Sequence, residues 1–561
     1  MLNLYSKSIQ DFYRTSPMRE GILNWYPFDE KASVLESSGG ALTDFLRSHC
    51  TIAETFNGDY KGESKFDYIV VIDPGEITSG LLKKYHSLLN EHGCLLMAFE
   101  NSYGLQYFAG KRNLYTGLPY NFQNGVNKAE VENSLKLAGF AGQKWYYPFT
   151  NHYLTQEIYS DNFMPNEFLN HRGQAFIEDD YTKGFDERVL WKEIIRGGAF
   201  PFLCNSYLVE ARVCADDKEC NVDFAAITAY RESSKAFITT VHSDGTAKKR
   251  AVFDEGKVCL KSLDAIHKEL EVLGVNVLPV NLEGDSLIMK RLNLPTIWDY
   301  WSRKLIEGRL EERELFSHYD RIYEEIKKSS VQGRIYWELV PANCFYDADK
   351  DELIFFDQEF FWEGFNPDVV IVRAIYALIL SVEFHQDPRI NEWIDKLKKR
   401  YGLTNKWDEL SKIAFNKTHE YVFNTVHTEP VTKSAERVVW HMEELQTERE
   451  REFRRYKKMC ITANALKDMN INHTVIYGYG VRGKMLRYVL EENGIDIACI
   501  IDKSLPNVRG VPLFPTIEEV AADIEMDVII VTPLKDAKHM ADDIRLKTRC
   551  HVVTVEEITN G

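Results

Sequence analysis

Several features of secreted, membrane-spanning or metal-binding chains are missing from this sequence of 561 residues. Its ten cysteines are scattered without any CxxC pair, so their spacing favours reduced thiols over zinc ligands or disulfides. The first residues, MLNLYSKSIQDFYRT, lack the apolar core of a signal peptide. The longest apolar stretch, VVIVRAIYALILSV, has 14 residues and contains Arg373, which suits a buried helix better than a membrane span. We therefore expect a cytoplasmic protein without direct membrane insertion.

The sequence also has no long basic run, and its formal net charge is −17. This balance disfavours a general binder of nucleic acid or of anionic membranes, and we expect no nucleic-acid partner. Aromatic residues make up 12% of the chain and hydrophobic residues 44%, which argues against disorder. The length predicts three or four domains.

The residue pattern divides the chain into four segments. Residues 1–165 alternate apolar strand-like runs with helical stretches, which predicts an α/β domain with a parallel sheet. Residues 166–430 pass from β runs to helices broken by one hairpin. Mixed-sign charges over 431–470 predict a long, mostly solvated helical linker. A coiled coil through which the chain forms an oligomer is the alternative for this segment. Residues 471–561 return to an α/β pattern, so the expected fold class is multidomain α/β.

The stretch IYWELVPANCFYDADKDELIFFDQEF has the spacing of a phosphotransfer centre. Glu338 is followed five residues later by Asn343 and, after a predicted hairpin, by Asp357. Phosphoryl transfer needs a carboxylate that orients the hydroxyl and accepts its proton, and oxygen ligands that hold Mg²⁺ on the phosphates. The alternative is an exposed turn that merely collects acidic residues. Asp357 argues against it, because an unpaired carboxylate between LIFF and FF would be costly to bury.

WELVPANCFY and LIFFDQEFFW together resemble the GDxxPxN…IDxE core of aminoglycoside-phosphotransferase-like and choline-kinase-like small-molecule kinases. They are more similar to the kinase-like part of bacterial methyltransferase–kinase proteins found with cell-surface polysaccharide enzymes. The resemblance implies a protein-kinase-like (α+β) domain that binds Mg-ATP, with Asn343 and Asp357 on the metal. Glu338 stands where these kinases carry Asp, so a domain that binds Mg-ATP but transfers slowly, or not at all, is an alternative.

The same resemblance extends to the preceding segment, which is similar to a kinase small lobe. It implies a phosphate-holding lysine at Lys248 or Lys249 and a helix partner for it at Glu269 or Glu271. No glycine-rich loop precedes these residues, so FPFLCNSYLVEA is expected to cover the phosphates instead.

VLESSGGALTDFL has the pattern of a strand, a glycine turn and a helix, with Glu36 at the strand end and Gly39 and Gly40 in the turn. Together with FDYIVVIDPGE and LLNEHGCLLMAFENSYGLQYFAG, it resembles the S-adenosylmethionine-dependent methyltransferases associated with polysaccharides, over about residues 20–165. The resemblance implies a Rossmann-like domain that binds S-adenosylmethionine. Glu100 and Asn101 are further polar candidates, with capping of the next turn as the alternative.

The stretch of this segment that would form the cofactor-binding site is short. Only 29 residues separate Glu36 from the strand that starts at Phe66, whereas one βαβ unit needs about 30 or more. Glu54 stands where an acid would bind the ribose, and Asp59 where one would approach the adenine. Reduced or lost cofactor binding in a retained fold is therefore an alternative to methyl transfer.

TVIYGYGVRGKMLRYVL places Gly478, Gly480 and Gly483 between a predicted strand and a helix, and Asp502 ends the next strand. This is the dinucleotide-type fingerprint in its proper context. The segment resembles small Rossmann-like domains appended to sugar-modifying enzymes, which implies NAD or nucleotide-sugar binding. We expect a binding module rather than an oxidoreductase, because no acid or base for hydride transfer is evident.

Three functions remain open from the sequence. The first is a phosphotransferase that acts on a sugar or glycan in cell-surface polysaccharide biosynthesis. The second is an S-adenosylmethionine-dependent glycan methyltransferase with an inactive kinase-like domain, and the third is a non-catalytic multidomain scaffold. In each case the expected partners include membrane-bound polysaccharide assembly proteins.

Overall fold

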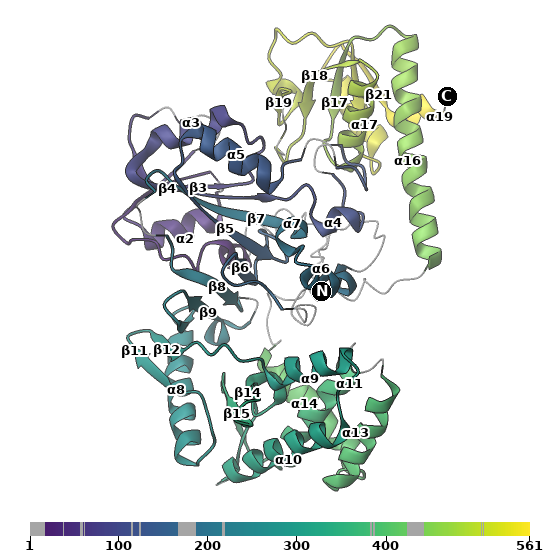
Figure 1. Cartoon of the computed structure of the whole chain (residues 1–561). Helices are drawn as coiled ribbons and strands as arrows, with labels where there is room; N and C mark the ends of the chain where they lie inside the picture. The colour runs from purple at the N-terminus through teal and green to yellow at the C-terminus, as the bar shows by residue number, and fades with distance from the viewer. Residues whose placement is uncertain are drawn as a thin grey trace.

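The computed structural model describes most of the chain (Figure 1). The described residues are 17–37, 39–56, 60, 62–113, 116–122, 125–166, 187–215, 219–229, 231–331, 333–381, 384, 387–422, 442–505, 508 and 510–560. They form a mixed α/β protein with one large sheet, a helical region and a smaller parallel sheet near the C-terminus. Within these ranges, no helix is both long and apolar enough to cross a membrane.

Four parallel strands begin the large sheet. They are β1 (Ser33–Glu36), β2 (Ile52–Thr55), β3 (Phe66–Ile72) and β4 (Leu89–Glu100). Their order is β2-β1-β3-β4, and every neighbouring pair is parallel. The carboxyl ends of these strands therefore lie at one edge, which is where open α/β sheets bind their ligands.

Three antiparallel strands extend this sheet. They are β5 (Gly142–Phe149), β6 (Glu157–Ser160) and β7 (Ser206–Arg212). β7 lies between β4 and β5, and all of its residues are buried. The prediction that FPFLCNSYLVEA covers nucleotide phosphates is therefore wrong, because this segment forms the short helix α7 (Phe200–Leu203) and a central strand.

Helices cover both faces of the parallel strands. These elements are η2 (Pro17–Ile22), α2 (Ala41–His49), α3 (Ser79–Leu88), α4 (Leu105–Phe108), α5 (Lys128–Ala138) and α6 (Glu187–Arg196). Because successive strand side chains point to opposite faces, Ile69 of β3 packs in one cluster with Leu82 of α3 and Leu135 of α5. The next residue, Val70, packs on the other face with Leu42 of α2.

Five more strands continue the sheet beyond β6. They are β8 (Val222–Ile227), β9 (Phe237–His242), β10 (Thr246–Ala251), β12 (Ser286–Lys290) and β11 (Val280–Glu283), in that spatial order. Helix α8 (Gly256–Val272) connects β10 to β11. β8 pairs with β6, so one sheet of twelve strands spans the predicted boundary between 1–165 and 166–430. The predicted boundary itself stays a prediction.

The helical region follows β12 and surrounds a hairpin. Its helices are α9 (Ile297–Ile306), α10 (Glu312–Ser329), α11 (Asp368–Leu380), α13 (Pro388–Arg400) and α14 (Trp407–Val422). Its short elements are β13 (Arg334–Tyr336), η5 (Pro341–Asn343), β14 (Cys344–Asp347), β15 (Glu352–Phe355) and β16 (Phe361–Glu363). The antiparallel pairing of β14 with β15 confirms the predicted hairpin.

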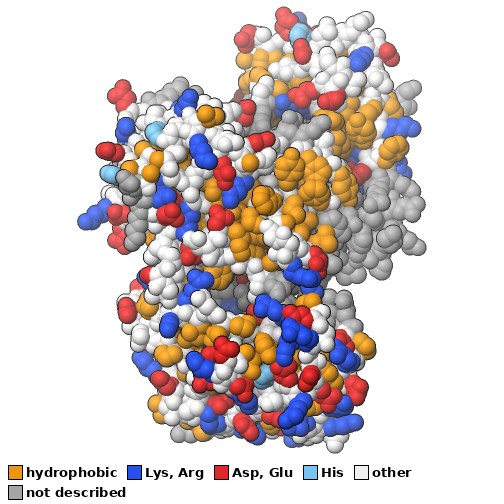
Figure 2. Space-filling model, viewed as in Figure 1, with side chains coloured by type: hydrophobic (Ala, Val, Ile, Leu, Met, Phe, Trp, Pro, Cys, Tyr) orange, Lys and Arg blue, Asp and Glu red, His pale blue; other side chains and the backbone are white. Residues whose placement is uncertain are grey.

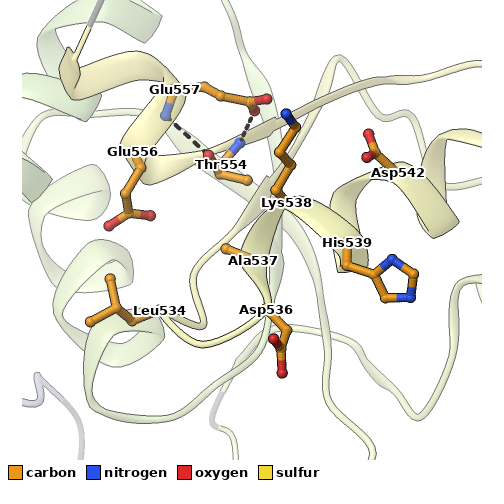
Figure 3. A pocket seen from close by; sticks show the side chains of 9 residues that line it. All are labelled: Leu534, Asp536, Ala537, Lys538, His539, Asp542, Thr554, Glu556 and Glu557. Atoms are coloured by element: carbon orange, nitrogen blue, oxygen red, sulfur yellow. Dashed lines mark hydrogen bonds between the residues drawn. The ribbon is translucent and has the colours of Figure 1, made fainter.

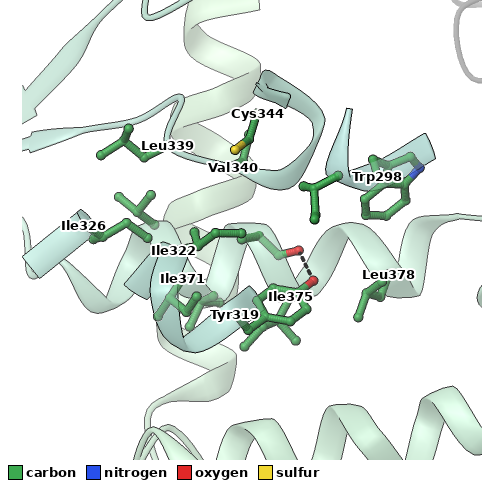
Figure 4. Close-up of a cluster of buried hydrophobic side chains, with 14 of the residues drawn as sticks. Trp298, Tyr319, Ile322, Ile326, Leu339, Val340, Cys344, Ile371, Ile375 and Leu378 are labelled. Carbon is green, nitrogen blue, oxygen red and sulfur yellow. Dashed lines mark hydrogen bonds between the residues drawn. The ribbon is translucent and has the colours of Figure 1, made fainter. Parts of the chain in front are cut away.

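The core of the helical region lies between α10 and α11. The apolar run that predicted a buried helix forms α11, in which Ile371, Ile375 and Leu378 are fully buried. These side chains face α10, where the Tyr319 hydroxyl donates a hydrogen bond of 3.0 Å to the Ala374 carbonyl (Figure 4). The hairpin packs on this core, because Cys344 and Phe355 belong to the same buried cluster.

The C-terminal sheet is entirely parallel. Its strands are β17 (His473–Tyr477), β18 (Asp496–Ile501), β19 (Leu513–Phe514), β20 (Val528–Val531) and β21 (His551–Thr554), with helices α17 (Val481–Glu492), α18 (Ala537–Arg545) and α19 (Val555–Asn560) and the turn η6 (Ile517–Glu519). The spatial order β19-β18-β17-β20-β21 corresponds to 3-2-1-4-5 in chain order. A doubly wound sheet with this order has its ligand crevice between β17 and β20.

Helix α16 (Met442–Asp468) lies along this sheet (Figure 1). The sequence predicts a mostly solvated helical linker over 431–470, of which residues 431–441 lie outside the described part. The C-terminal half of α16 differs from that prediction, because Met459, Ala463 and Leu466 are buried against α17 and its neighbours. These apolar side chains, three to four residues apart, place one face of α16 in the core of the C-terminal part.

A loop that follows α4 joins the first part of the chain to the C-terminal part. Buried Arg112 forms an ion pair with Glu452 of α16. A Cβ atom on Gly117 would lie only 2.8 Å from the Val481 carbonyl oxygen at the start of α17. Leu118 packs against the core of the C-terminal part. This loop therefore holds α16 and α17 against the first sheet.

Two leucines of α11 provide a test of the helical core. Leu378 is fully buried and Leu380 is mostly exposed, although both lie in the last turn of the same helix. We expect Leu378→Ala to lower the free energy of unfolding by about 2–5 kcal/mol, because it leaves a cavity. The matched control Leu380→Ala changes it by less than about 0.5 kcal/mol. Urea denaturation of the full chain measures both, and equal effects would contradict this packing.

Candidate functional site

The hairpin brings two of the predicted metal ligands to one end. The Phe356 N–H donates a hydrogen bond of 3.0 Å to the Asn343 carbonyl, just beyond the paired strands β14 and β15. Asp357 is the next residue and has a φ of 55°, a backbone conformation that is uncommon for a residue other than glycine. Asn343 and Asp357 therefore lie side by side at the open end of the hairpin.

Lys249 reaches this end of the hairpin from β10. Its Nζ contacts the Asp357 carboxylate and lies 2.6 Å from Oε1 of Glu359. Lys248 is the neighbouring residue in the same strand, so its side chain points to the opposite face. The structure thus distinguishes the two lysines that the sequence left as alternatives, and Lys249 is the one at the hairpin.

The predicted helix partner of the lysine is wrong. Glu269 of α8 forms an ion pair with Arg334 at 3.1 Å, and Glu271 is exposed. Neither contacts Lys249, whose carboxylate partners both come from the segment after β15.

The ion pair between Lys249 and Asp357 keeps both groups charged. Burial alone would lower the pKa of Lys249, but the adjacent carboxylates of Asp357 and Glu359 raise it above its ordinary value. Burial alone would raise the pKa of Asp357, but the Lys249 ammonium lowers it below its ordinary value. The site therefore carries a fixed ammonium beside an ionised carboxylate at neutral pH.

Glu338 adjoins the two metal-ligand candidates. Its carboxylate accepts a hydrogen bond of 2.5 Å from Nδ2 of Asn343 and lies 3.1 Å from the Arg373 guanidinium. Since an ionised carboxylate can only accept hydrogen bonds, Nδ2 of Asn343 must face Glu338, and Oδ1 points elsewhere. Burial raises the pKa of Glu338; Arg373 opposes this rise, and the neighbouring Glu359 and Asp357 add to it. A raised pKa makes Glu338 a better proton acceptor.

Several residues that hold this site were not among those predicted from the sequence. Gln358 donates a side-chain hydrogen bond of 2.9 Å to the Glu338 carbonyl, and its own N–H donates to Nε2 of His267 at 3.2 Å. Burial lowers the pKa of His267, which favours the neutral ring that this acceptor role requires. Glu359 and Arg231 form an ion pair of 2.7 Å beside Lys249. The only sequence signal among these was Glu359, the acid of the IDxE pattern.

In the first part of the chain, Glu36 ends β1 and is fully buried. Its carboxylate accepts a hydrogen bond from the Thr43 hydroxyl of α2 and one of 3.2 Å from the Gly39 N–H. Gly39 and Gly40 have φ values of 69° and 64°, which side chains rarely adopt. The Gly39 N–H and the Thr43 hydroxyl therefore hold the carboxylate of Glu36 at the strand end.

The remainder of the predicted cradle is short in the structure as well. Among the described residues, β2 is the one strand between β1 and β3 in the chain. Glu54 lies on β2, is exposed, and accepts a hydrogen bond of 3.0 Å from the Tyr60 hydroxyl. Asp59 lies outside the described residues. Of the two acids predicted for the ribose and adenine, only Glu54 is therefore placed by the structure.

Glu100 is the last residue of β4 and Asn101 follows it, and the two have different roles. Buried Glu100 forms an ion pair of 2.5 Å with buried Lys111 and accepts a hydrogen bond from the Tyr107 hydroxyl. Asn101 accepts a hydrogen bond of 3.0 Å from the Tyr103 N–H, as the capping alternative expects, and donates one of 2.8 Å to the Cys204 carbonyl. Asn101 therefore fixes the loops around the sheet edge.

A further carboxylate, Asp73, follows β3 and was not predicted as a site residue from the sequence. Oδ1 of Asp73 lies 2.6 Å from Nε2 of His152, and Nδ1 of that ring lies 2.8 Å from the Ser206 hydroxyl. Burial alone would raise the pKa of Asp73, but His152 lowers it. Together with Glu36 and Glu100, Asp73 gives three of the parallel strands an acid at the carboxyl end. Its position after the quoted run FDYIVVID was the available sequence signal.

The surface beside this edge is apolar. Figure 2 shows hydrophobic side chains gathered over α4 and α7, and exposed aromatic residues of this region include Tyr103, Phe108 and Phe202. An acidic strand edge beside exposed aromatic rings offers both polar and apolar contacts.

In the C-terminal sheet, Gly478 follows β17, Gly480 immediately precedes α17, and Gly483 is the third residue of α17. A Cβ atom on Gly483 would lie 2.1 Å from the Gly478 carbonyl oxygen, whereas one on Gly480 would meet open space. The N–H of Tyr479 donates a hydrogen bond of 2.6 Å to the Asp502 carboxylate at the end of β18. Asp502 therefore holds the turn itself through one of its oxygens.

A hollow of about 870 Å³ lies beyond the carboxyl ends of β20 and β21 (Figure 3). Its lining residues are Leu534, Asp536, Ala537, Lys538, His539, Asp542, Thr554, Glu556 and Glu557. The glycine turn is not part of this lining. Across the described ranges, no group of three or more His, Cys, Asp or Glu side chains is arranged to hold a metal ion.

Comparisons with known proteins leave the family open. No family model matches the sequence, and no curated protein matches it. A solved structure from Thermotoga maritima, described as an S-adenosylmethionine-dependent methyltransferase and possible histamine N-methyltransferase, is 10% identical. The match covers 36% of this chain and 91% of that chain, with a TM-score of 0.21. A likeness at this level does not assign a fold or an activity.

Two glycines at the start of α17 provide a matched test. We expect Gly483→Ala to lower the free energy of unfolding by about 1–3 kcal/mol, because its methyl group would collide with the Gly478 carbonyl. Gly480→Ala has open space and is expected to stay within about 0.5 kcal/mol of the original chain. Calorimetric melting of the full chain checks both, and an unchanged trace for Gly483→Ala would refute the close approach.

Proposed function

We propose that this protein is an ATP-dependent phosphotransferase that acts on a hydroxyl group of a sugar or glycan. The observation that carries the proposal is the contact of Lys249 with Asp357. Lys249 lies on β10, the third strand of β8, β9 and β10, and protein kinases hold the nucleotide phosphates with a lysine on their third strand. The sugar or glycan substrate and its place in polysaccharide biosynthesis are supported by the sequence resemblance alone.

The residues present suit Mg-ATP. Asp357 is partly exposed and ionised, and Asn343 has its amide nitrogen on Glu338, so its oxygen is available for a metal. Mg²⁺ favours such oxygen ligands and would bridge the phosphates of the nucleotide. Lys249 would hold a phosphate as a fixed positive charge.

Glu338 would orient the acceptor hydroxyl and accept its proton. Arg373 and Asn343 hold its carboxylate from two sides, which offsets the looser position expected of a longer side chain in place of Asp. Its raised pKa favours proton uptake. These contacts favour transfer over a domain that only binds Mg-ATP.

The first test compares the two adjacent lysines. Saturating Mg-ATP is expected to stabilise the full chain, by about 2.7 kcal/mol at 100 times the Kd. Lys249→Met is expected to abolish this stabilisation, because it removes the cation at Asp357. The matched control Lys248→Met should retain it, since its side chain is on the other face. Thermal melting with and without nucleotide measures each variant against its own baseline.

Two results would contradict the kinase proposal. One is the absence of any shift when the original chain is titrated with Mg-ATP. The other is an equal shift in both lysine variants, which would place the nucleotide elsewhere.

We also propose methyl transfer from S-adenosylmethionine as a second candidate function. The supporting observation is the set of acids at the carboxyl ends of adjacent parallel strands, Glu36, Asp73 and Glu100. The glycine turn at Gly39 and Gly40 would admit the cofactor, and Asp73 is partly exposed whereas its partner His152 is buried. The short stretch that contains β2 would supply only part of the cradle.

Calorimetric titration with S-adenosylmethionine tests this candidate. We expect binding by the original chain and its loss in Gly40→Val, because φ at this position disfavours a β-branched residue. Leu137→Ala, an exposed change on the distant helix α5, is the control that keeps binding. No heat of binding in the original chain would reject methyl transfer.

For the C-terminal sheet we propose binding of NAD or of a nucleotide-sugar, without redox chemistry. The strand order, the glycine turn and Asp502 support a nucleotide site at the crevice between β17 and β20. The cytoplasmic location, an oligomeric state and association with membrane-bound polysaccharide assembly proteins stay predictions from the sequence.

A further inference from the structure

The loop between β8 and β9 reaches the hairpin site. It contains the short turn η4 (Ser233–Lys235), and the Arg231 N–H donates a hydrogen bond of 2.9 Å to the Thr228 carbonyl. From this bend the Arg231 guanidinium extends to Oε2 of Glu359 at 2.7 Å. The loop therefore places a cation beside the lysine of β10, although it contains no glycine.

Glu359 holds two cations at once. Oε1 accepts from Lys249 at 2.6 Å, and Oε2 accepts from Arg231 at 2.7 Å. Only 7% of the Glu359 side chain is exposed, against 5% for Lys249 and 17% for Arg231. Asp357 is 40% exposed, so it forms the open side of the cluster and Glu359 the closed side. A ligand at Asp357 would therefore lie beside Lys249 and Arg231, and Glu359 holds both cations from the buried side of the cluster.

The charges of this cluster leave room for an anion. Arg231 and Lys249 bring two positive charges, and Glu359 balances one of them. When Asp357 turns its carboxylate to a metal ion, Lys249 keeps Glu359, whose carboxylate it shares with Arg231. The two cations then lie beside the carboxylate that holds the metal, and an arginine fork with an ammonium group is a common way to bind a phosphate.

We propose that Arg231 and Lys249 form a phosphate-binding pair that Glu359 positions. In this arrangement the arginine of the loop over 228–236 contacts the phosphates in place of a glycine-rich backbone. Glu359 takes the positioning role that a helix glutamate has in protein kinases. The inference rests on the proposed phosphotransferase function; it adds Arg231 to the site and gives a role to Glu359, the acid of the IDxE pattern.

A structural role is the competing explanation. The ion pairs could join the strand of Lys249 to the hairpin and contribute nothing to ligand binding. The two explanations differ in their dependence on phosphate: a phosphate-binding pair affects ATP far more than adenosine, whereas a structural link affects both equally.

The experiment measures the Kd of Mg-ATP and of adenosine for the full chain by calorimetry. We expect Arg231→Met to raise the Kd of Mg-ATP about tenfold, equivalent to about 1.4 kcal/mol, and to leave that of adenosine within about twofold. Lys235→Met is the matched control from the same loop, since Lys235 pairs with Glu232 and lies over the Tyr421 ring. It should leave both constants unchanged.

A second pair of variants tests the positioning role. Glu359→Gln is expected to raise the Kd of Mg-ATP by about tenfold, because both cations lose their anchor. Glu269→Gln, which changes the helix glutamate on Arg334, should have no effect on it. Arg231→Lys should recover part of the affinity that Arg231→Met loses, as a retained charge predicts.

The outcomes separate this inference from the function on which it rests. If the original chain binds Mg-ATP but Arg231→Met and Glu359→Gln bind it equally well, the phosphate-binding pair is wrong and the kinase proposal stands. Equal losses for ATP and adenosine also overturn the pair and support a structural link. If the original chain binds no Mg-ATP, both the kinase proposal and the phosphate-binding pair are rejected.

Discussion

The pairing of β6 with β8 is the contact on which the arrangement of the protein depends. Through two residue pairs, Glu157 with Ala226 and Ile158 with Ala225, a sheet that begins as four parallel strands continues into five antiparallel ones. Exposed strand edges are prone to pair, and here the edge of β6 is satisfied within the chain. As a result, the strand ends near Glu36 and the lysine of β10 belong to one sheet, and the ion pair of Lys249 with Asp357 connects that sheet to the helical region.

Local features of the sequence predicted the local structure well. The polar turn between LIFF and CFYD predicted the hairpin, and the spacing of Asp502 after the glycines predicted its place at a neighbouring strand end. The long-range partners could not be predicted from one sequence: His152 lies 79 residues from Asp73, and Lys249 lies 108 residues from Asp357. The position of β7 between β4 and β5 was not predicted for the same reason. The residue pattern of a buried strand indicates that it is a strand, but not which strands pair with it.

The acids of the candidate sites have partners within the chain. Glu36 is bound by its own glycine turn, Asp73 by His152 and Glu100 by Lys111. Such pairing follows from burial, since an isolated charge removed from water costs far more than a paired one. A ligand at any of these positions would exchange one set of partners for another, so its affinity would reflect the difference between two well-satisfied states.

The backbone contact at Gly117 limits how the chain can be divided. The loop that carries it belongs by sequence to the first part, yet its neighbours are Val481 and Glu452, more than 300 residues later. A protein truncated before residue 442 would lose Glu452, the ion-pair partner of buried Arg112, and would expose Leu118 to water. A larger side chain at Gly117 would therefore disturb the start of α17, so two segments that look separate in the sequence are one unit in packing.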